Sequence, residues 1–476
     1  MTAASAPIHS VADLRGRRVV VLGLARSGVA AVRFLADAEA VVVAYDRRPA
    51  TELAESVTAL GARPVHLALG VPEAEARALM THADVIVTSP SVSPRFPTTD
   101  AWLRRALLEA EGRGAELISE VELFLRLTQA RVLAVTGTKG KTTTASLAAA
   151  ILAESEVPHV LGGNIGRPLI EEAASLGPDE WAVLELSELQ LPTISRGAEL
   201  ALYTNVGADH LDRHGSVEAY RAVKARLAEL TAPSGRVVLN HDDAGCRELG
   251  ERLRPESLAW YGLARPGRGE TEAWIDEDGW LVLAGTRLLP AAEVPLPGRH
   301  MLGNVLCAAL GALLADVPPG DTAAAIRAFP GVPHRLETVG ERDGVRFVND
   351  SMATIPAAAI AAIEAFDSPV VVIAGGSDKG LDYGELAGVV ASRCRAAVLI
   401  GETAAQLERL LAGRIDVERA ASMKEAVELA AGLAQPGDVV LLAPAAASFD
   451  MFTDYAARGD AFRAAVIALP NSRDDR

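Results

Sequence analysis

The sequence predicts an α/β protein made of three doubly wound α/β domains. Short apolar strand-like runs alternate with alanine-rich helical stretches along most of the chain, and glycine-rich or polar segments follow the strand-like runs. The length of 476 residues agrees with roughly three domains of about 150 residues each. We expect these domains over residues 1–118, 119–331 and 332–476, with Rossmann-like folds in the first and last and a P-loop ATPase-like fold in the middle.

The first domain begins with a predicted βαβ unit. An apolar strand over residues 17–22 leads into Gly23-Leu24-Ala25-Arg26-Ser27-Gly28, a helix follows, and a second strand over 41–46 ends in Asp46. This is a degraded dinucleotide fingerprint, because Ala25 stands in place of the middle glycine. A helix N-terminus favours phosphate whatever is attached to it, so a nucleotide diphosphate, NAD and simple packing remain open.

The second domain contains a candidate phosphate-binding loop. A strand over 131–135 leads into Thr136-Gly137-Thr138-Lys139-Gly140-Lys141-Thr142-Thr143, directly before an alanine-rich helix. Glycines let successive backbone N–H groups point at phosphate oxygens, Lys141 supplies positive charge, and the Thr142 hydroxyl can bind magnesium. The loop departs from the pattern G-x-x-x-x-G-K-[ST], because Val135 stands at the first glycine. A plain glycine turn with surface lysines is therefore the structural alternative.

Polar residues near further strands of this domain offer several kinds of chemistry. Glu185, at a predicted strand end, suits either a Mg²⁺ ligand or the cap of a turn. His210 and His214 have helical spacing, but the missing H-E-x-x-H glutamate and cysteine favour a Mg–ATP site over zinc. Lys224, taken alone, is typical of a solvated helix lysine. Residues 260–297 predict short strands, which we interpret as a β-rich appendage of the domain.

The third domain repeats the α/β pattern. Strands are expected at 345–348, 370–374, 397–400 and 439–443, separated by alanine-rich helices. Three of these strands end in polar or glycine-containing segments, namely Asn349-Asp350-Ser351, Ala374 to Gly380, and Pro444 to Ser448. Because parallel strands place their carboxyl ends at one edge, these segments predict a common ligand crevice, in which Lys379 offers a cation for a carboxylate.

Composition limits the partners and the compartment. The chain has 46 Lys+Arg against 62 Asp+Glu, a net charge of −16, which argues against nucleic acid or an anionic membrane as the main partner. The three cysteines have no framework spacing, and no apolar run approaches membrane-spanning length. We therefore expect a cytoplasmic protein that binds small molecules.

The motifs, in their order along the chain, resemble the Mur ligase family from residue 17 to residue 462. The motifs that carry this resemblance are Thr136 to Thr142, Gly162-Gly163-Asn164-Ile165-Gly166, Glu185-Leu186-Ser187, Asn205 to His210, Tyr220 to Lys224, His300 to Asn304, His334-Arg335, Asn349-Asp350-Ser351, Gly375 to Lys379, and Ser448. The compact phosphate loop is the form that this family uses.

The resemblance implies an ATP-dependent, amide-bond-forming ligase, most similar to the branch that adds D-glutamate to UDP-N-acetylmuramoyl-L-alanine. Such an enzyme uses an acyl-phosphate intermediate and serves peptidoglycan precursor synthesis, and thereby cell shape and division. The implied enzyme is a monomer that uses ATP and two Mg²⁺ ions. Ligation of L-glutamate, or a folylpolyglutamate-synthase-like reaction, are the alternatives, although the latter lacks a uridine-nucleotide domain like residues 1–118.

The resemblance also implies roles for individual residues. Lys224 matches a lysine that becomes carbamylated and, with Lys141 and His210, belongs to the implied catalytic residues. The implied metal ligands are Thr142, Glu185, His210 and carbamylated Lys224. The implied ATP-binding residues are Gly137, Thr138, Lys139, Gly140, Lys141, Thr142, Thr143, Asn304, Arg335 and Asp350. The implied substrate-binding residues are Ser27, Asp46, Arg47, Ser89, Asn164, His210, Lys379 and Ser448. The first four match the uridine-diphosphate pocket of the family, so the resemblance implies that the first domain binds a uridine diphosphate and not NAD.

Three departures from the family pattern concern the glutamate side of the reaction. Met352 and Ile355 stand where the family commonly has a lysine and an asparagine after Asn349-Asp350-Ser351. Glu188-Leu189 replaces the usual Ser-Phe, and Tyr455 stands where a phenylalanine often shapes the glutamate site. These departures leave the stereochemistry of the glutamate open without touching the ATP chemistry.

Overall fold

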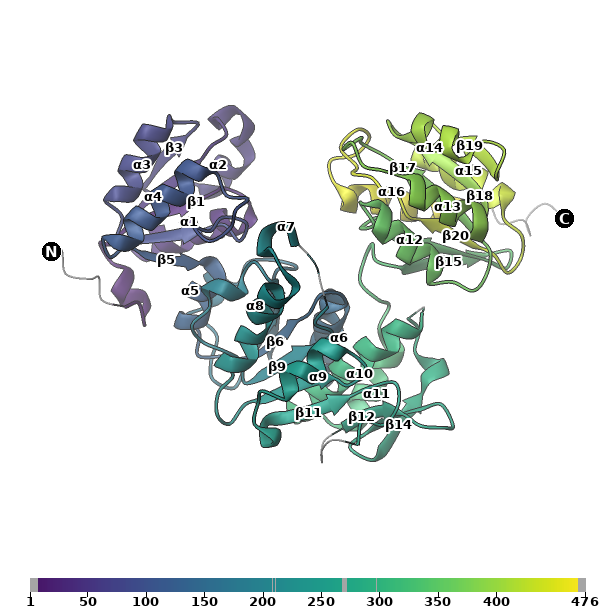
Figure 1. Cartoon of the computed structure of the whole chain (residues 1–476), viewed down its shortest axis with the longest axis horizontal. Helices are drawn as coiled ribbons and strands as arrows, with labels where there is room; N and C mark the ends of the chain where they lie inside the picture. The colour runs from purple at the N-terminus through teal and green to yellow at the C-terminus, as the bar shows by residue number, and fades with distance from the viewer. Residues whose placement is uncertain (1–6, 208, 210, 268–271, 297, 470–476) are drawn as a thin grey trace. The chain divides into compact units, whose positions relative to one another are not determined.

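The computed structural model describes residues 7–207, 209, 211–267, 272–296 and 298–469 (Figure 1). The chain divides into two compact units, which are Met1–Glu293 with Gly303–Arg327, and Val294–Leu302 with Ala328–Arg476. The first unit contains two β-sheets and the second contains one. The α/β class with three sheets confirms the predicted fold class, whereas the exact domain boundaries stay a prediction.

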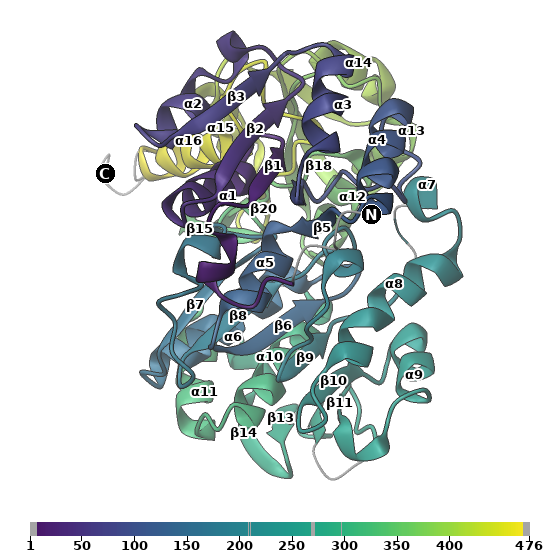
Figure 2. The ribbon, with the colours of Figure 1, turned by 90° about the vertical axis from the view of Figure 1, so that its left-hand side faces the viewer.

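The first sheet is parallel throughout and has the strand order β3-β2-β1-β4-β5. Its strands are β1 (Arg18–Leu22), β2 (Val41–Asp46), β3 (Val65–Leu69), β4 (Val85–Thr88) and β5 (Glu116–Ser119). Its helices are α1 (Arg26–Asp37), α2 (Ala54–Leu60), α3 (Glu73–Thr81) and α4 (Ala101–Gly112) (Figure 2).

Alternating side chains of β1 bury both faces of this sheet. Val19 and Val21 belong to a core that includes residues of α1, such as Leu35. Val20 and Leu22 belong to the opposite core, which includes residues of α3 and α4. A strand with both faces buried explains the continuous apolar run that predicted β1, and the arrangement is doubly wound as expected.

The second sheet has nine strands in the order β14-β13-β12-β11-β10-β9-β6-β8-β7. Its strands are β6 (Arg131–Thr136), β7 (His159–Gly163), β8 (Trp181–Glu185), β9 (Leu200–Tyr203), β10 (Arg236–Asn240), β11 (Leu258–Tyr261), β12 (Glu272–Ile275), β13 (Trp280–Leu283) and β14 (Thr286–Pro290). Its helices are α5 (Glu120–Leu127), α6 (Lys141–Glu154), α7 (Leu211–His214), α8 (Val217–Leu230), α9 (Ala244–Gly250), α10 (Arg299–Leu314) and α11 (Pro319–Ala328).

The predicted appendage is β-rich, but it continues the central sheet. Strand β11 pairs with β10 in parallel, β12 pairs with β11 in parallel, and only the last two pairings, β12 with β13 and β13 with β14, are antiparallel. The short hairpin turns gave this region its different sequence character, since antiparallel neighbours need no crossover helix.

The sheet of the second unit has the order β15-β16-β20-β17-β18-β19 and is parallel except for the β15–β16 pair. Its strands are β15 (Glu337–Arg342), β16 (Val345–Asn349), β17 (Val370–Gly375), β18 (Cys394–Ile400), β19 (Asp416–Arg419) and β20 (Val439–Leu442). Its helices are α12 (Pro356–Glu364), α13 (Gly384–Arg393), α14 (Ala404–Leu411), α15 (Met423–Leu433) and α16 (Tyr455–Ile467).

Strand β17 is buried on both faces in the same way as β1. Val370 and Val372 pack in a core with α12, α13 and α14, while Val371 and Ile373 pack in a core with α15 and α16. Within the part of the chain that the structure describes, no helix has both the length and the apolar character needed to span a membrane.

Candidate functional site

Two glycines shape the loop between β6 and α6. Gly137 and Gly140 have φ angles of +147° and +88°, which side chains other than glycine rarely adopt. A Cβ atom at Gly137 would lie 1.9 Å from Thr204 Oγ1, and one at Gly140 would lie 2.3 Å from Asn304 Oδ1. Both positions therefore require glycine. Asn304 of α10 lies beside the loop, and its role in ATP binding stays a prediction.

The exit of the neighbouring strand β9 holds the loop in place. Asn205 Oδ1 accepts hydrogen bonds from the backbone N–H groups of Thr138 at 3.1 Å and Lys139 at 2.9 Å. Thr204 Oγ1 donates to the Lys139 carbonyl at 2.6 Å. Neutral groups from a second strand thus fix the backbone of the phosphate loop before any ligand binds.

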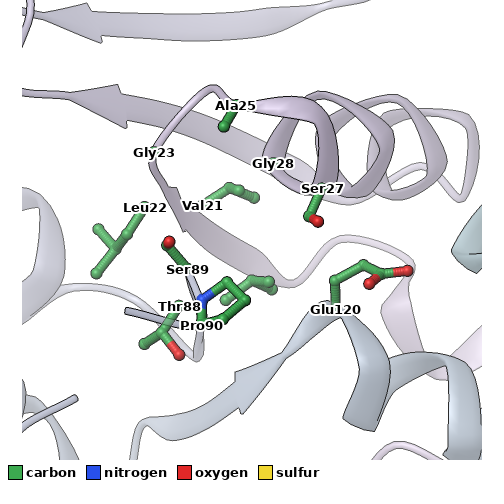
Figure 3. A pocket seen from close by; sticks show the side chains of 11 residues that line it. Val21, Leu22, Gly23, Ala25, Ser27, Gly28, Thr88, Ser89, Pro90 and Glu120 are labelled. Atoms are coloured by element: carbon green, nitrogen blue, oxygen red, sulfur yellow. The ribbon is translucent and has the colours of Figure 1, made fainter. Parts of the chain in front are cut away.

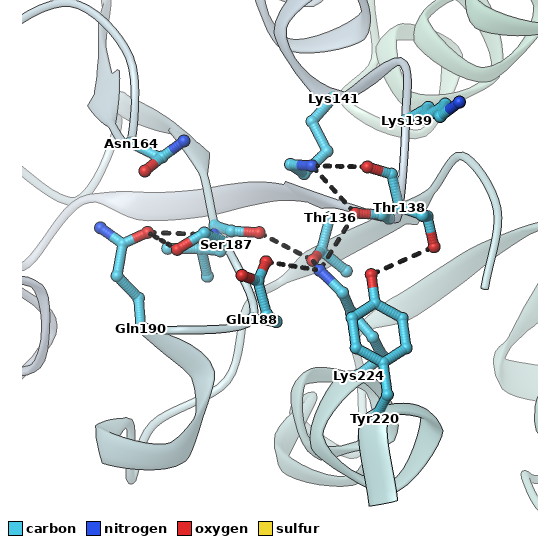
Figure 4. A network of polar contacts seen from close by, with 12 residues as sticks. Thr136, Thr138, Lys139, Lys141, Asn164, Ser187, Glu188, Gln190, Tyr220 and Lys224 are labelled. Atoms are coloured by element: carbon cyan, nitrogen blue, oxygen red, sulfur yellow. Dashed lines mark hydrogen bonds and ion pairs between the residues drawn. The ribbon is translucent and has the colours of Figure 1, made fainter. Parts of the chain in front are cut away.

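Lys141 is the first residue of α6, and its side chain is half-buried. Its Nζ donates to the carbonyl oxygens of Gly137 and Thr138, each at 3.0 Å (Figure 4). The ammonium group therefore curls over the loop at the N-terminal end of a helix. This is where the helix dipole and the exposed N–H groups favour phosphate.

Lys224 of α8 is fully buried, although its helical pattern taken alone is typical of a solvated lysine. Its Nζ donates to the Gly137 carbonyl at 3.0 Å and to Thr136 Oγ1 at 3.2 Å, and it lies 5.6 Å from the centre of the Tyr220 ring. Burial, followed by repulsion from Lys141, lowers the pKa of Lys224 to about 7. A substantial fraction of this amine is consequently neutral near pH 7.

Two buried glutamates, Glu185 at the end of β8 and Glu188 just after it, lie near these lysines. Glu185 accepts hydrogen bonds from Thr142 Oγ1 at 2.8 Å and from Asn164 Nδ2 at 2.9 Å. Glu188 is 6% exposed, and its Oε2 lies 3.9 Å from Lys224 Nζ (Figure 4). Glu185 thus connects the residues predicted to bind magnesium and the muramoyl substrate. This contact favours the metal interpretation of Glu185 over a turn cap.

The donor set around Glu185 suits Mg²⁺. Carboxylate and hydroxyl oxygens are the hard ligands that Mg²⁺ prefers, and phosphate oxygens and water complete its six-fold coordination. Among the described residues, no group of three or more His, Cys, Asp or Glu could hold a metal ion. His210, predicted as a catalytic, metal and substrate residue, lies outside the described residues. Of the histidine pair considered for zinc, only His214 is described, and its ring lies edge-on to the rings of Phe96 and Tyr220.

A cavity of about 70 Å³ lies between the β1–α1 loop and the end of β4 (Figure 3). Ser27 and Ser89, both predicted for the uridine-diphosphate pocket, line it. Asp46 does not; its buried carboxylate accepts from the Leu24 N–H at 2.9 Å and pairs with Arg48. Asp46 therefore holds the loop that begins at Gly23. Arg47 is exposed, 4.0 Å from Asp100.

In the second unit, two strand-exit loops carrying predicted glutamate ligands lie against each other. The Ser377 N–H donates to the Ala447 carbonyl at 2.9 Å, which brings the loop of exposed Lys379 to the loop of buried Ser448. Asp350 Oδ1 accepts from the Leu336 N–H at 3.1 Å, and burial raises the pKa of Asp350 to about 6 although Arg335 opposes the shift.

Arg458 of α16 joins two exit loops of this unit. Its fully buried guanidinium donates through Nε to Ser351 Oγ at 2.9 Å and through Nη2 to the Ser351 carbonyl at 2.9 Å. Through Nη1 it donates to the carbonyls of Ala446 at 3.0 Å and Ala447 at 3.1 Å. The residues after Asp350 and the residues before Ser448 therefore share one anchor.

Sequence reasoning assigned no individual role to several residues that build these sites. Asn205, Tyr220, Glu188 and Arg458 were visible only as members of motifs or of helices. Tyr220 Oη donates to Thr138 Oγ1 at 3.1 Å. A strand-exit asparagine beside a glycine loop could have suggested Asn205, but Arg458 carried no signal, since arginine supplies most of the positive charge of this chain.

Family models match all three parts of the chain. The N-terminal domain of MurD-like Mur ligases matches residues 17–107, the Mur ligase middle domain matches 135–312, and the Mur ligase glutamate ligase domain matches 334–446. Proteins named UDP-N-acetylmuramoylalanine--D-glutamate ligase from Solibacter usitatus and Symbiobacterium thermophilum are 41% and 38% identical. The alignments cover 96% and 95% of this chain and 99% and 98% of those proteins.

Solved structures agree in fold. UDP-N-acetylmuramate-alanine ligase MurC from Thermotoga maritima matches with a TM-score of 0.59 and 17% identity over 95% of this chain and 99% of its own. A pseudomurein peptide ligase type C from Methanothermus fervidus matches with a TM-score of 0.54 and 18% identity over 95% and 100%. With a phosphate loop, two lysines and two acids gathered at one sheet edge, and with three family models matched in order, the chain belongs to the Mur ligase family.

Proposed function

We propose that this ligase joins D-glutamate to UDP-N-acetylmuramoyl-L-alanine and converts ATP to ADP and phosphate. The observation that carries the proposal is the convergence of Lys141 and Lys224 on the Gly137 carbonyl, beside Glu185 and Thr142. Phosphoryl transfer needs a cradle, cations and metal-binding oxygens in one place. The names of the curated relatives supply the choice of D-glutamate and of the nucleotide-sugar substrate.

The reaction follows from these groups in two steps. The alanyl carboxylate attacks the γ-phosphorus of ATP, the bond from that phosphorus to the bridging oxygen breaks, and ADP leaves. The glutamate amine then attacks the carbonyl of the acyl phosphate, phosphate leaves, and the amine loses a proton as the amide forms. Lys141 supplies fixed positive charge for the first step, where negative charge spreads over the phosphoryl oxygens.

Thr142 and Glu185 would hold a first Mg²⁺ ion at the loop. When it is bound, Mg²⁺ neutralises phosphate charge and orients the γ-phosphoryl group. Asn164 already donates to Glu185, and this hydrogen bond keeps the carboxylate turned toward Thr142. The hydrogen bond from Asn164 should hold the Glu185 carboxylate in one orientation as the ion arrives.

We assign Lys224 as the site of carbamylation. A carbamate forms when a neutral amine attacks CO₂ and loses a proton, and the buried Lys224 amine has a pKa lowered to about 7. The product is an anion with two oxygens, which converts a cation beside Lys141 into a ligand for a second Mg²⁺. His210, which the family resemblance also implies as a ligand, completes this assignment.

We assign each substrate to one of the three predicted domains. Residues 1–118 bind the UDP moiety through the cavity lined by Ser27 and Ser89, and residues 119–331 bind ATP. Residues 332–476 bind glutamate, with Lys379 and Ser448 at its side-chain carboxylate. We also assign Arg335 and Asp350 to the binding of ATP.

The test is ADP release with the two acceptor substrates supplied separately and together. We expect release only when UDP-N-acetylmuramoyl-L-alanine and D-glutamate are both present, with a dipeptidyl product in matching amount. An efficiency with L-glutamate equal to or above that with D-glutamate would replace the enantiomer but keep the ligase. Activity with folyl substrates and none with the UDP-linked substrate would contradict the proposal.

A further inference from the structure

Glu120 is a buried acid that the proposed reaction does not use. It is the first residue of α5, directly after β5, and is 6% exposed. Its side chain lines the cavity that contains Ser27 and Ser89, on the side opposite the β1–α1 loop (Figure 3). Glu120 is the only acidic or basic side chain among the described residues that line this cavity.

Backbone groups of the segment that follows β7 fix the position of Glu120. Its Oε1 accepts a hydrogen bond from the Ile170 N–H at 3.2 Å, with Leu169 also contributing a backbone contact. Ser119 Oγ accepts from the Glu122 N–H at 3.1 Å and thereby caps the start of α5. Backbone contacts therefore fix the side chain of Glu120 at the edge of the cavity that it lines.

The opposite side of the cavity is built for an anion. Helix α1 begins at Arg26, and its first turn, which includes Ser27 and Gly28, lines the cavity. A Cβ atom at Gly28 would lie 1.8 Å from the Gly23 carbonyl, so the helix start and the β1–α1 loop meet closely. Free N–H groups and the helix dipole at such a start favour phosphate.

We propose that Glu120 is a further substrate-binding residue, whose carboxyl group forms a hydrogen bond with the diphosphate of the UDP-linked substrate. This inference rests on the proposed function. A hydrogen bond between two oxygens needs a proton on one of them. A diphosphate diester carries no proton near neutral pH, so the proton must come from Glu120. The nucleotide-binding state is therefore the neutral carboxylic acid, and an ionised Glu120 would repel the diphosphate.

The surroundings of Glu120 agree with this protonation. Burial raises the pKa of Glu120 to about 7, and the backbone contacts from Ile170 and Leu169 only partly oppose the rise. Charged residues on the elements around it do not contribute to this shift. These residues are Arg26 and Arg33 on α1, Glu171 and Glu172 after Ile170, and Glu122 on α5 itself.

A consequence is that binding of the UDP-linked substrate depends on pH. The neutral form of Glu120 predominates below pH 7 and disappears above it, so affinity should fall as pH rises. For a pKa of about 7, the neutral fraction falls by roughly 20-fold between pH 6.5 and 8.5. The charge of the substrate itself does not change over this range, because its diphosphate is diesterified.

The experiment is calorimetric titration of the full chain with UDP-N-acetylmuramoyl-L-alanine, without ATP, at pH 6.5, 7.5 and 8.5. We expect the wild-type dissociation constant to rise by roughly 20-fold over this range. Glu120→Gln keeps an acceptor for the Ile170 N–H and a permanent donor, so its affinity should be independent of pH. Glu120→Ala should bind weakly at every pH.

Two controls separate this inference from structural effects and from the proposed function. Glu172 lies on the same segment as Ile170, but its carboxylate pairs with Arg167 and does not line the cavity. The Glu172→Gln variant should therefore keep the wild-type dependence of substrate affinity on pH. A pH-independent wild type, or a Glu120→Gln variant with the same pH dependence as wild type, would overturn the inference. The proposed function would then still be supported by ADP release that requires both UDP-N-acetylmuramoyl-L-alanine and D-glutamate. Absence of such release from the wild-type protein would contradict the proposed function instead.

Discussion

The phosphate loop of the nine-stranded sheet and the strand-exit loops of the second unit hold their candidate ligand groups in different ways. Thr204 and Asn205, two neutral residues, hold the backbone of loop residues 138 and 139. In the second unit one buried cation, Arg458, holds the loops after β16 and β20 together through four neutral oxygens.

This difference indicates in which region a substitution can reduce catalysis without reducing the stability of the fold. At the phosphate loop, Lys141 contacts the Gly137 and Thr138 carbonyls, but Thr204 and Asn205 hold the same loop independently. The charge of Lys141 can therefore be removed while these other anchors of the backbone remain. In the second unit, the loss of a single arginine would leave several buried oxygens without donors and would release both loops. The same substitution should therefore affect folding and glutamate binding together.

Lys141→Ala gives the largest expected effect. We expect kcat to fall by about 10²-fold or more, because the ammonium stabilises charge that develops in the transition state. The thermal midpoint should stay within about 2 °C of wild type, since Asn205 and Thr204 still hold the loop. Steady-state ADP release and differential scanning fluorimetry measure the two quantities.

Lys424→Ala is the control for Lys141→Ala. Lys424 is an exposed lysine of α15 that pairs only loosely with Glu428 at 3.9 Å, so its loss should change neither quantity. Normal turnover of Lys141→Ala would contradict the role of this loop in phosphoryl transfer. A large fall in the thermal midpoint would show that Lys141 is needed for stability as well as for catalysis.

Arg458→Met tests the other half of the comparison. The substitution removes the donors to Ser351, Ala446 and Ala447, and we expect the second unit to lose about 3 kcal/mol of unfolding free energy. Urea denaturation followed by circular dichroism measures this loss. Arg463→Met, on the same helix but in a partly exposed ion pair with Glu337, should cost about 1 kcal/mol or less. Equal losses for the two variants would remove the special role of Arg458.

Lys379→Ala should change binding without changing stability. Lys379 is exposed and donates no side-chain hydrogen bond to any described residue, so the fold should not depend on it. We expect the KM for glutamate to rise about tenfold and the KM for ATP to stay constant, which is the signature of a lost ground-state contact. Initial rates over a matrix of glutamate and ATP concentrations provide the measurement, and an unchanged KM for glutamate would reassign the residue.

Asn205→Ala gives the smallest expected effect. It removes an acceptor that serves the N–H groups of Thr138 and Lys139 and a donor to the Lys139 carbonyl. The Thr138 N–H still donates to the backbone carbonyl of residue 205, and Thr204 still donates to the Lys139 carbonyl. Because these anchors remain, we expect the KM for ATP to rise by only about fivefold to tenfold, a net loss of about 1 kcal/mol. A loss as large as that of Lys141→Ala would show that the loop depends on this single anchor.

The sequence alone was sufficient for most of the fold. Strands with both faces buried, such as β1 and β17, are continuous apolar runs and were predicted within one or two residues. Strands β3 and β19 were not predicted, because they lie at sheet edges, are partly exposed and have mixed sequences. The hairpins from β12 to β14 were recognised as strands, but their continuity with the central sheet depends on pairing between distant segments.

The candidate site was predictable where chemistry lies in a local motif and not where it depends on burial. The loop from Gly137 to Thr142 and Glu185 are readable from spacing. The helical pattern around Lys224 gave no sign that its side chain is fully buried beneath Gly137, and only the family resemblance indicated its importance. Arg458 and Glu120 were missed because their roles come from contacts between segments far apart in the chain.

The central claim is that the alanyl carboxylate takes the γ-phosphoryl group of ATP at the phosphate loop. Positional isotope exchange tests it most directly, with ATP carrying ¹⁸O in the β,γ-bridge, UDP-N-acetylmuramoyl-L-alanine present and glutamate absent. We predict that ¹⁸O moves from the bridge to a non-bridging β position only with the UDP-linked substrate, and not in Lys141→Ala. Absence of exchange from a wild-type enzyme that ligates glutamate at full rate, with free rotation of bound ADP shown independently, would contradict the account.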